Sequence, residues 1–221
     1  MEKAIINFLT DLYPFLMDHY QPQGWWPLLS LKKSGINPTQ RGNNTGYHPK
    51  NYNIPDNSLE IFEVMIGSIL MQNTSWVNAD KALGNLAVHK ILTPKSICDI
   101  SHDELGQIIR SSGYYNQKAS RLQRIARFVS KNPIADLQSK SVEHLRIQLL
   151  NIKGVGPETA DTILLYALKK PSFVIDAYTR RLLQRLGLVN GKKSYKHYKH
   201  LFERAFPPVK KMFQFIMIIM H

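Results

Sequence analysis

Apolar residues recur at intervals of three and four along most of the 221-residue chain, which is the period of an amphipathic helix. The pattern is strongest in a predicted core helix that begins near Leu59, with apolar positions at Leu59, Phe62, Met65, Ile66, Ile69 and Leu70. An amino-terminal stretch from about Lys3 to Tyr20 has the same spacing. No segment alternates as a half-buried strand does, and the sequence has no internal repeat. We therefore predict an all-α protein.

Shorter helices are expected after the core helix, separated by turn and capping signals. They are predicted at about 76–88, from Thr93-Pro94, from the capping box of Ser101 and Glu104, at 117–130 and at 142–150. The helix at 117–130 carries a basic residue at every third position beside its apolar face: Lys118, Arg121, Arg124 and Arg127. A basic face in contact with solvent is the simplest interpretation of these four side chains.

Two irregular stretches lie between the first helix and the core helix. The first places Trp25 and Trp26 side by side before a proline. Adjacent aromatic residues cannot share one face of an element, so at least one is expected to face something other than the main core; simple packing is the alternative. The second, from Leu31 to Ser58, is rich in Asn, Gly, Pro and Lys. Its length indicates either a functional loop or a mobile insertion, and the sequence does not distinguish them.

The chain is strongly basic, and its charge is unevenly distributed. It has 29 lysine and arginine residues against 16 aspartate and glutamate residues, a formal net charge of +13. From Ser141 onward the counts are 14 basic and 5 acidic residues. Such an excess indicates a polyanionic partner, most often a nucleic acid, with an anionic membrane surface or solubility alone as the alternatives.

The cysteine content and the amino-terminal residues indicate the cellular compartment of the protein. A single cysteine, Cys98, excludes an internal disulfide and a metal cluster with four thiolate ligands. The apolar amino-terminal run contains Glu2 and Asp11, which argues against a secretory signal. No stretch approaches the roughly eighteen uncharged apolar residues of a membrane span. We expect a soluble protein of the cytoplasm, with no membrane partner.

The candidate chemistry begins at a Gly-Val-Gly turn. Gly154 and Gly156 allow backbone angles and close contacts that a Cβ would forbid. The proline that follows suits the first position of a helix, so the turn presents free N–H groups and the positive end of a helix dipole. An anion is the natural ligand of such a turn, and contacts of this kind position a protein on DNA but carry no sequence information. The flanking apolar-periodic segments, 142–152 and 158–168, make the whole a helix-hairpin-helix.

An aspartate follows this motif after a short apolar segment. Residues 173–175 are β-branched or aromatic, and Asp176 stands where the next helix begins. That helix is predicted to end at Gly187. Taken alone, Asp176 is an ordinary helix N-cap. The hairpin immediately before it favours a role in chemistry instead.

Together these motifs resemble the endonuclease III superfamily of base-excision DNA glycosylases, over about Phe62 to Leu188. The signature of that family is a helix-hairpin-helix, here LNIKGVGPETAD, followed by a catalytic aspartate, here Asp176 in VIDAYTRR. The family's glutamine at the end of the central helix, which fills the space left by an extruded base, matches Gln72. Its wedge loop before a basic helix matches residues 113–119, with Tyr114 as the wedge.

The resemblance implies a two-lobed helical DNA glycosylase fold with a DNA-binding cleft between the lobes. We expect residues 1–58 to pack on the carboxy-terminal lobe, residues 59–170 to form the central lobe with the hairpin at about 142–170, and residues 171–221 to complete the first lobe. The family continues with further helix where this chain ends in FQFIMIIMH. We expect this ending either to leave the pocket incomplete or to expose apolar surface that a partner covers.

Two departures from the family pattern narrow the implied activity. Members that also cut the DNA backbone carry a lysine nucleophile just inside the second hairpin helix, where this chain has Glu158, and a carboxylate cannot form an imine. Many members end in a four-cysteine iron–sulfur loop, which this sequence lacks. A monofunctional enzyme without a cluster is implied. It is most like the bacterial 3-methyladenine DNA glycosylase III branch, which shares the glutamate and a WWP segment.

The resemblance also gives individual residues a role. Those expected to contact DNA are Gln72, Tyr114, Lys153, Gly154, Gly156 and Thr159. Asp176, as a carboxylate favoured by the helix amino terminus, stabilises the cationic sugar and orients or deprotonates water. Trp25 and Trp26 form a base pocket and stack on an alkylated purine, which already carries positive charge. Such a base needs no general acid, and no second acid beside Asp176 is evident.

The implied partner is double-stranded DNA that contains a damaged base, bound by a monomer at the bacterial nucleoid. In related proteins hairpin carbonyls hold a monovalent cation; those of Leu150, Ile152 and Val155 match, and no metal site made by side chains is expected. Two alternatives stay open. One is a uracil or thymine mismatch glycosylase on the same scaffold, and the other is a non-catalytic helix-hairpin-helix protein that only binds DNA.

Overall fold

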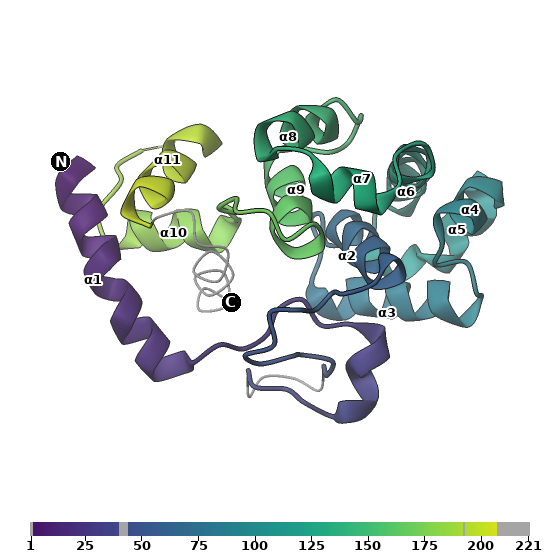
Figure 1. The fold of residues 1–221 in the computed structure, drawn as a ribbon, viewed down its shortest axis with the longest axis horizontal. Coiled ribbons are helices and arrows are strands. Elements are labelled where there is room, and N and C mark those ends of the chain that lie inside the picture. Colours follow the sequence, from purple (N-terminus) through teal and green to yellow (C-terminus); the bar gives the residue numbers. More distant parts are fainter. Residues whose placement is uncertain (1, 40–43, 192, 207–221) are drawn as a thin grey trace.

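The computed structural model describes residues 2–39, 44–191 and 193–206 (Figure 1). Within them every regular element is a helix, which confirms the all-α prediction. The elements are α1 (Glu2–Tyr20), η1 (Leu29–Ser34), α2 (Ser58–Leu70), α3 (Trp76–Val88), α4 (Pro94–Asp99), α5 (His102–Ile108), η2 (Arg110–Ser112), α6 (Tyr115–Lys131), α7 (Ile134–Ser139), α8 (Val142–Leu150), α9 (Pro157–Thr162), η3 (Ile163–Ala167), α10 (Ala177–Arg185) and α11 (Tyr195–Ala205). Here η1 and η2 are 3₁₀-helices, and η3 is a π-helix.

Helix α2 is the centre of the core, as its apolar stripe predicts. Its side chains are buried without interruption from Ile61 to Leu70, and α3, α6 and η3 pack against it. Leu59, which was expected in the stripe, is instead 61% exposed. The reason is its place in the first turn, where Asn57 caps the backbone N–H groups of Leu59 and Glu60 at the protein surface.

Helix α6 departs from the solvated basic face expected for it. Lys118 is completely buried, and its Nζ donates to the carbonyl oxygens of Leu70 at 2.8 Å and Ser112 at 2.6 Å. Burial, with a smaller effect from the charge of Arg121, lowers the pKa of Lys118 to about 8. The expectation was wrong for this residue because two carbonyls that end neighbouring elements converge on it. Lys118 thereby ties the end of α2 to the loop before Tyr114.

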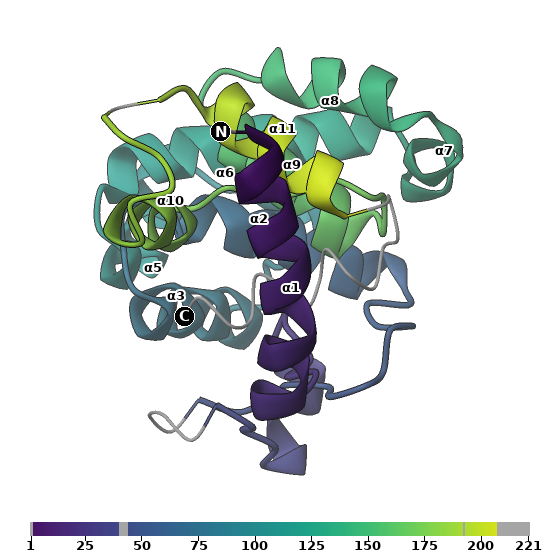
Figure 2. The same ribbon diagram turned by 90° about the vertical axis from the view of Figure 1, so that its left-hand side faces the viewer.

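The first and last described helices lie side by side. Both views show α1 packed against α11 (Figures 1 and 2). A hydrogen bond of 2.9 Å from Arg204 to Glu2 adds to this contact. The division of the chain into three segments stays a prediction, and the FQFIMIIMH ending lies outside the described residues. None of the described helices combines the length and the apolar character needed to cross a bilayer.

The long irregular segment before α2 supports the two tryptophans, where it is described. The ring nitrogens of His48 lie 2.8 Å from the carbonyl oxygen of Asn51 and 3.0 Å from that of Trp26. The backbone N–H of His48 also donates to Gly24. Gly24 has φ +78°, and a Cβ there would come within 2.1 Å of the His48 backbone, so only glycine fits. The segment thus holds Trp25 and Trp26 against the core.

Candidate active site

One pocket of about 270 Å³ collects most of the residues that the sequence singles out. It lies where the end of α2, the hairpin between α8 and α9, η3 and the start of α10 meet. Seven predicted residues line it: Trp25, Trp26, Gln72, Gly154, Gly156, Thr159 and Asp176. Segments more than a hundred residues apart in the chain therefore converge on one cavity. Lys153 and Tyr114 are not among the lining residues.

Asp176 is both a helix cap and a pocket residue. It is 7% exposed, and its Oδ1 accepts hydrogen bonds of 2.7 Å from the backbone N–H and from the hydroxyl of Thr179. These bonds fix the carboxylate at the start of α10, where the helix dipole favours negative charge. The two interpretations of Asp176 are therefore compatible, since one oxygen caps the helix while the residue borders the cavity.

A second carboxyl group lies in the same pocket, which corrects the expectation that Asp176 has no acidic neighbour. Glu158, in the first turn of α9, lines the cavity and forms an ion pair of 3.6 Å with Arg180. The Glu158 side chain is 49% exposed, and its partial burial, followed by the negative charge of Asp176, raises its pKa, while Arg180 partly opposes this rise. The sequence conceals the pair because the fold brings together residues eighteen positions apart.

The two glycines of the hairpin turn differ in backbone conformation and in the space around them. Gly154 has φ +99°, and a Cβ there would lie 2.6 Å from Cγ of Arg121, as the strained turn predicts. Gly156 has φ −92°, which any residue adopts, so the expected backbone constraint is wrong there. No atom lies within 4 Å of its Cβ position, which leaves open space in front of the turn. Lys153 is exposed beside it, and its carbonyl accepts from Arg124 at 3.3 Å.

Gln72 is anchored on the hairpin. Its Nε2 donates to Thr159 Oγ1 at 2.9 Å and to the Gly154 carbonyl at 3.1 Å, while its Oε1 accepts from Arg121. Arg121 thus belongs to the site, although its position on a basic helix face gave no reason to single it out. Tyr114 stands apart, at the start of α6, with a left-handed backbone (φ 46°) and a 65% exposed side chain.

Three tryptophans form one wall of the cavity region. Trp26 is 3% exposed and Trp25 is half-buried, and both pack edge to face against Trp76 with ring centroids 5.1–5.2 Å apart. A Cβ on Gly67 would come within 2.8 Å of the Trp26 ring, so that glycine lets the indole lie on α2. Sequence reasoning missed Trp76, which stood only as the first residue of a helix.

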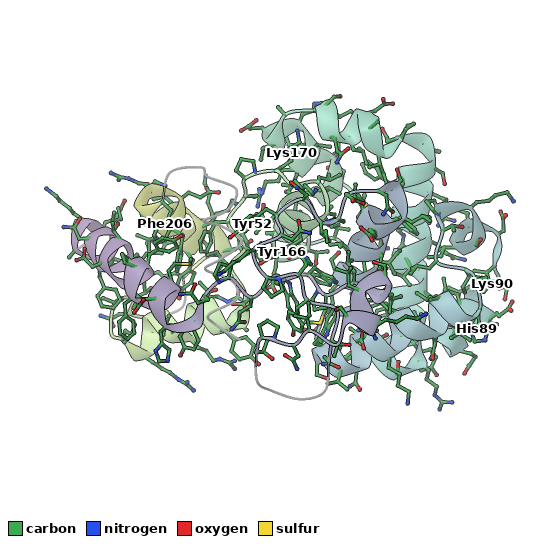
Figure 3. The ribbon with its side chains drawn as sticks, turned by 60° about the horizontal axis from the view of Figure 1, so that its bottom comes forward. Tyr52, His89, Lys90, Tyr166, Lys170 and Phe206 are labelled. Carbon is green, nitrogen blue, oxygen red and sulfur yellow. The ribbon has the colours of Figure 1, made fainter. Side chains whose placement is uncertain are left out.

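Tyr166 completes the pocket from the π-helix η3. It lies in the interior of the molecule (Figure 3) and is 1% exposed. Its ring centroid is 6.0 Å from that of Trp26. No pattern along the chain singles out Tyr166, because it sits within an apolar run that predicts an ordinary buried helix. The π-helical turn there is a local feature that periodicity does not report.

The hairpin carbonyls remain the candidate for a cation. In the described part of the chain, no three His, Cys, Asp or Glu side chains come together as metal ligands would. The Ile152 carbonyl accepts from the Val155 N–H at 2.9 Å, which uses one of its two lone pairs. The monovalent site on the Leu150, Ile152 and Val155 carbonyls stays a prediction.

Comparison with known proteins agrees with the helical fold described above. Residues 66–208 match the family described as HhH-GPD superfamily base excision DNA repair protein. A provisionally named DNA repair glycosylase of Methanocaldococcus jannaschii is 36% identical over 211 residues, 94% of this chain and 82% of that protein. The structure of H. pylori 3-methyladenine DNA glycosylase (MagIII) bound to 1,N6-ethenoadenine is 30% identical with a TM-score of 0.63, over 72% of this chain and 82% of that one. A non-covalent endonuclease III–DNA complex, 19% identical, shares the fold over 99% of this chain and 84% of that one with a TM-score of 0.66.

Proposed function

Because the chain belongs to the HhH-GPD superfamily of base excision DNA repair proteins, we propose that it is a monofunctional DNA glycosylase. It hydrolyses the N-glycosidic bond of a damaged base, an alkylated purine such as 3-methyladenine. The observation that carries the proposal is the buried carboxylate of Asp176 in the pocket that Gln72 and the hairpin border. Double-stranded DNA is the partner, and the enzyme acts as a monomer at the bacterial nucleoid.

The reaction requires the damaged nucleotide to leave the duplex. Extrusion costs a few kcal/mol of stacking and pairing. The exposed side chain of Tyr114 wedges the duplex, and Gln72 fills the gap from the end of α2. Lys153 and the N–H groups of the Gly154–Gly156 turn hold the phosphates, with open space in front of Gly156 for close approach.

Bond cleavage places positive charge on the sugar. Asp176 faces that charge as a carboxylate whose position is fixed by Thr179, so electrostatic stabilisation requires no rearrangement. Water then adds to the sugar carbon, and Asp176 orients it or accepts its proton. Glu158 is the second carboxyl beside the reacting centre, and its raised pKa suits it to share that proton with Asp176.

The side chains that line the pocket support a reaction without strand cutting. Schiff-base chemistry needs an amine at the sugar carbon. None of the described residues that line the pocket is a lysine, and Glu158 occupies the position expected for one. Lys118 is a buried amine, but it does not line the pocket and its Nζ donates to the backbone carbonyls of Leu70 and Ser112. The protein therefore removes the base and stops.

The aromatic wall supports an alkylated purine as the substrate. Trp25 and Trp26 both line the pocket, and the half-buried Trp25 has the more accessible ring; stacking on a cationic base adds about 1–2 kcal/mol in a desolvated site. The similar H. pylori protein is named for 3-methyladenine and binds 1,N6-ethenoadenine. A uracil or thymine mismatch glycosylase is the alternative, and a thermostable thymine-DNA glycosylase, 17% identical, shares the fold.

The test is release of free base from matched duplexes. Each duplex holds one 3-methyladenine, 1,N6-ethenoadenine, uracil or a thymine mismatch, and the products are separated with and without alkaline cleavage. We expect 3-methyladenine to be released most efficiently, with strand breaks only after alkali. Release of none of these bases would favour a protein that only binds DNA. A covalent adduct trapped by borohydride would contradict the monofunctional assignment.

A further inference from the structure

The hydroxyl group of Tyr166 has no partner within the described protein. The side chain is 1% exposed, its Oη makes no hydrogen bond, and the residue borders the pocket that contains Asp176. A buried hydroxyl without a partner costs about 1–3 kcal/mol, and native proteins rarely leave such a group unpaired. Phenylalanine would fill the same volume without that cost.

Two other buried donors in the described part of the chain lack hydrogen-bond partners, but packing accounts for them. Trp26 Nε1 and Trp76 Nε1 belong to indoles that meet edge to face, 5.2 Å apart and nearly perpendicular. The edge of Trp26 that carries Nε1 also lies against Gly67. The Tyr166 hydroxyl is different, since its residue sits where the π-helix η3 meets the pocket and the charge of Asp176 acts on it. Burial, together with that charge, raises the pKa of Tyr166 well above its usual range, so the proton stays on the oxygen.

We infer that the Tyr166 hydroxyl donates a hydrogen bond to a lone pair on the extruded base, a ring nitrogen or a carbonyl oxygen. The inference rests on the proposed glycosylase function and deepens it. Asp176 and Tyr166 line the same pocket, so a base whose sugar lies beside Asp176 can also reach Tyr166. Such a base satisfies the donor that the folded chain leaves without a partner.

The chemistry of the leaving base makes this bond strongest in the transition state. When the bond between C1′ and the base nitrogen breaks, its electron pair leaves with the base, and C1′ becomes positive opposite Asp176. Water adds to C1′ and loses a proton to the carboxyl pair, while Tyr166 keeps its own proton. A neutral base leaves as an anion and gains most from the donor. A base alkylated to a cation leaves neutral and gains little.

The test compares wild type with Tyr166→Phe, which removes one oxygen and keeps the ring. We expect its urea unfolding midpoint to equal or exceed that of wild type, because no bond is lost. The value of kcat/KM for release of 1,N6-ethenoadenine should fall about 10- to 100-fold, and that for 3-methyladenine less than about threefold. Tyr198→Phe is the matched control, since Tyr198 is equally buried on α11 and accepts from Gln184 at 3.4 Å.

The control should keep the kcat/KM of wild type for both bases. For any base that the wild type does not release, the readout is affinity: Tyr166→Phe should bind that duplex at least about fivefold more weakly, yet bind undamaged duplex equally well. Unchanged release and affinity in Tyr166→Phe, or equal losses for the neutral and the cationic base, would overturn the inference. If wild type releases neither base, the proposed function fails separately, and the affinities still decide the role of Tyr166.

Discussion

Gln72 Nε2 donates to the hydroxyl of Thr159 at 2.9 Å, which joins the end of the central helix α2 to the second helix of the hairpin. A residue expected to enter the DNA is thereby held in place before DNA arrives. Arg121 binds the other end of the same amide. The side chain proposed to fill the gap and the turn proposed to hold phosphate are therefore joined by hydrogen bonds before DNA binds.

Removal of the Gln72 side chain should affect paired DNA most. In Gln72→Ala nothing fills the space of the extruded base, so we expect kcat/KM on a fully paired damaged duplex to fall about tenfold. With the damaged base in a single-stranded oligonucleotide, the loss should be less than about threefold, because no gap forms. Equal losses on the two substrates would show that Gln72 acts on catalysis and does not fill the gap.

The packing of Trp26 on α2 depends on Gly67. In Gly67→Ala the new methyl group would lie 2.8 Å from the Trp26 ring, and such overpacking costs about 1–3 kcal/mol. We expect lower stability in urea unfolding and weaker base release. Gly84→Ala is the control, since its Cβ meets no atom within 4 Å in helix α3 and should gain about 0.5–1 kcal/mol. If Gly67→Ala kept the stability and the base release of wild type, the Trp26 indole would be free to shift, and the predicted clash would be contradicted.

A buried ionic network holds the segment that precedes Asp176. Asp161 is fully buried and binds Arg146 at 2.8 Å, Tyr195 at 2.8 Å and Ser172 at 2.7 Å. Asp161→Asn removes the carboxylate charge that faces the partly buried Arg146 and Lys199, and we expect a loss of about 3 kcal/mol in urea unfolding.

The matched control for this network is Asp136→Asn. Asp136 is exposed on α7, so the substitution should change the unfolding free energy by less than about 0.5 kcal/mol. An unfolding midpoint of Asp161→Asn equal to that of the control would mean that the network contributes nothing to stability.

Glu63 should make stability depend on pH. It is 6% exposed on α2, accepts from the Leu29 N–H at 2.8 Å, and burial raises its pKa from 4.5 to about 7. A raised carboxyl pKa gives stability that is fully present below about pH 4.5 and is lost as pH rises through about 7, by about 3 kcal/mol. Glu63→Gln keeps the acceptor oxygen and should remove this loss. If the unfolding free energies of wild type and Glu63→Gln changed in parallel between pH 5 and 8, the predicted role of Glu63 would be refuted.

Local patterns predicted the elements well, since their causes are local. Helices α3 and α8 begin and end at the predicted residues, because apolar period and caps such as Ser141, which accepts from the His144 N–H, lie within a few positions. The same holds for Asp176, whose N-cap role is decided by the next turn.

Features made by the fold did not follow from these patterns. The placing of Glu158 and Asp176 in one pocket and the burial of Lys118 both require elements to meet in three dimensions. Tyr166 depends on a π-helical turn that has the composition of an ordinary helix. The segment before α2 looked like a loop, yet it holds the tryptophans through His48. Side-chain surroundings of this kind depend on tertiary contacts that spacing along the chain does not encode.

The central claim is that the Asp176 carboxylate drives base release, and Asp176→Asn tests it most directly. Asparagine is an equally good N-cap, so its Oδ1 can keep both bonds from Thr179 and the helix should remain folded. We predict that single-turnover release of 3-methyladenine falls at least about a thousandfold, while affinity for the damaged duplex stays within about threefold of wild type. Release at the wild-type rate by Asp176→Asn would contradict the account.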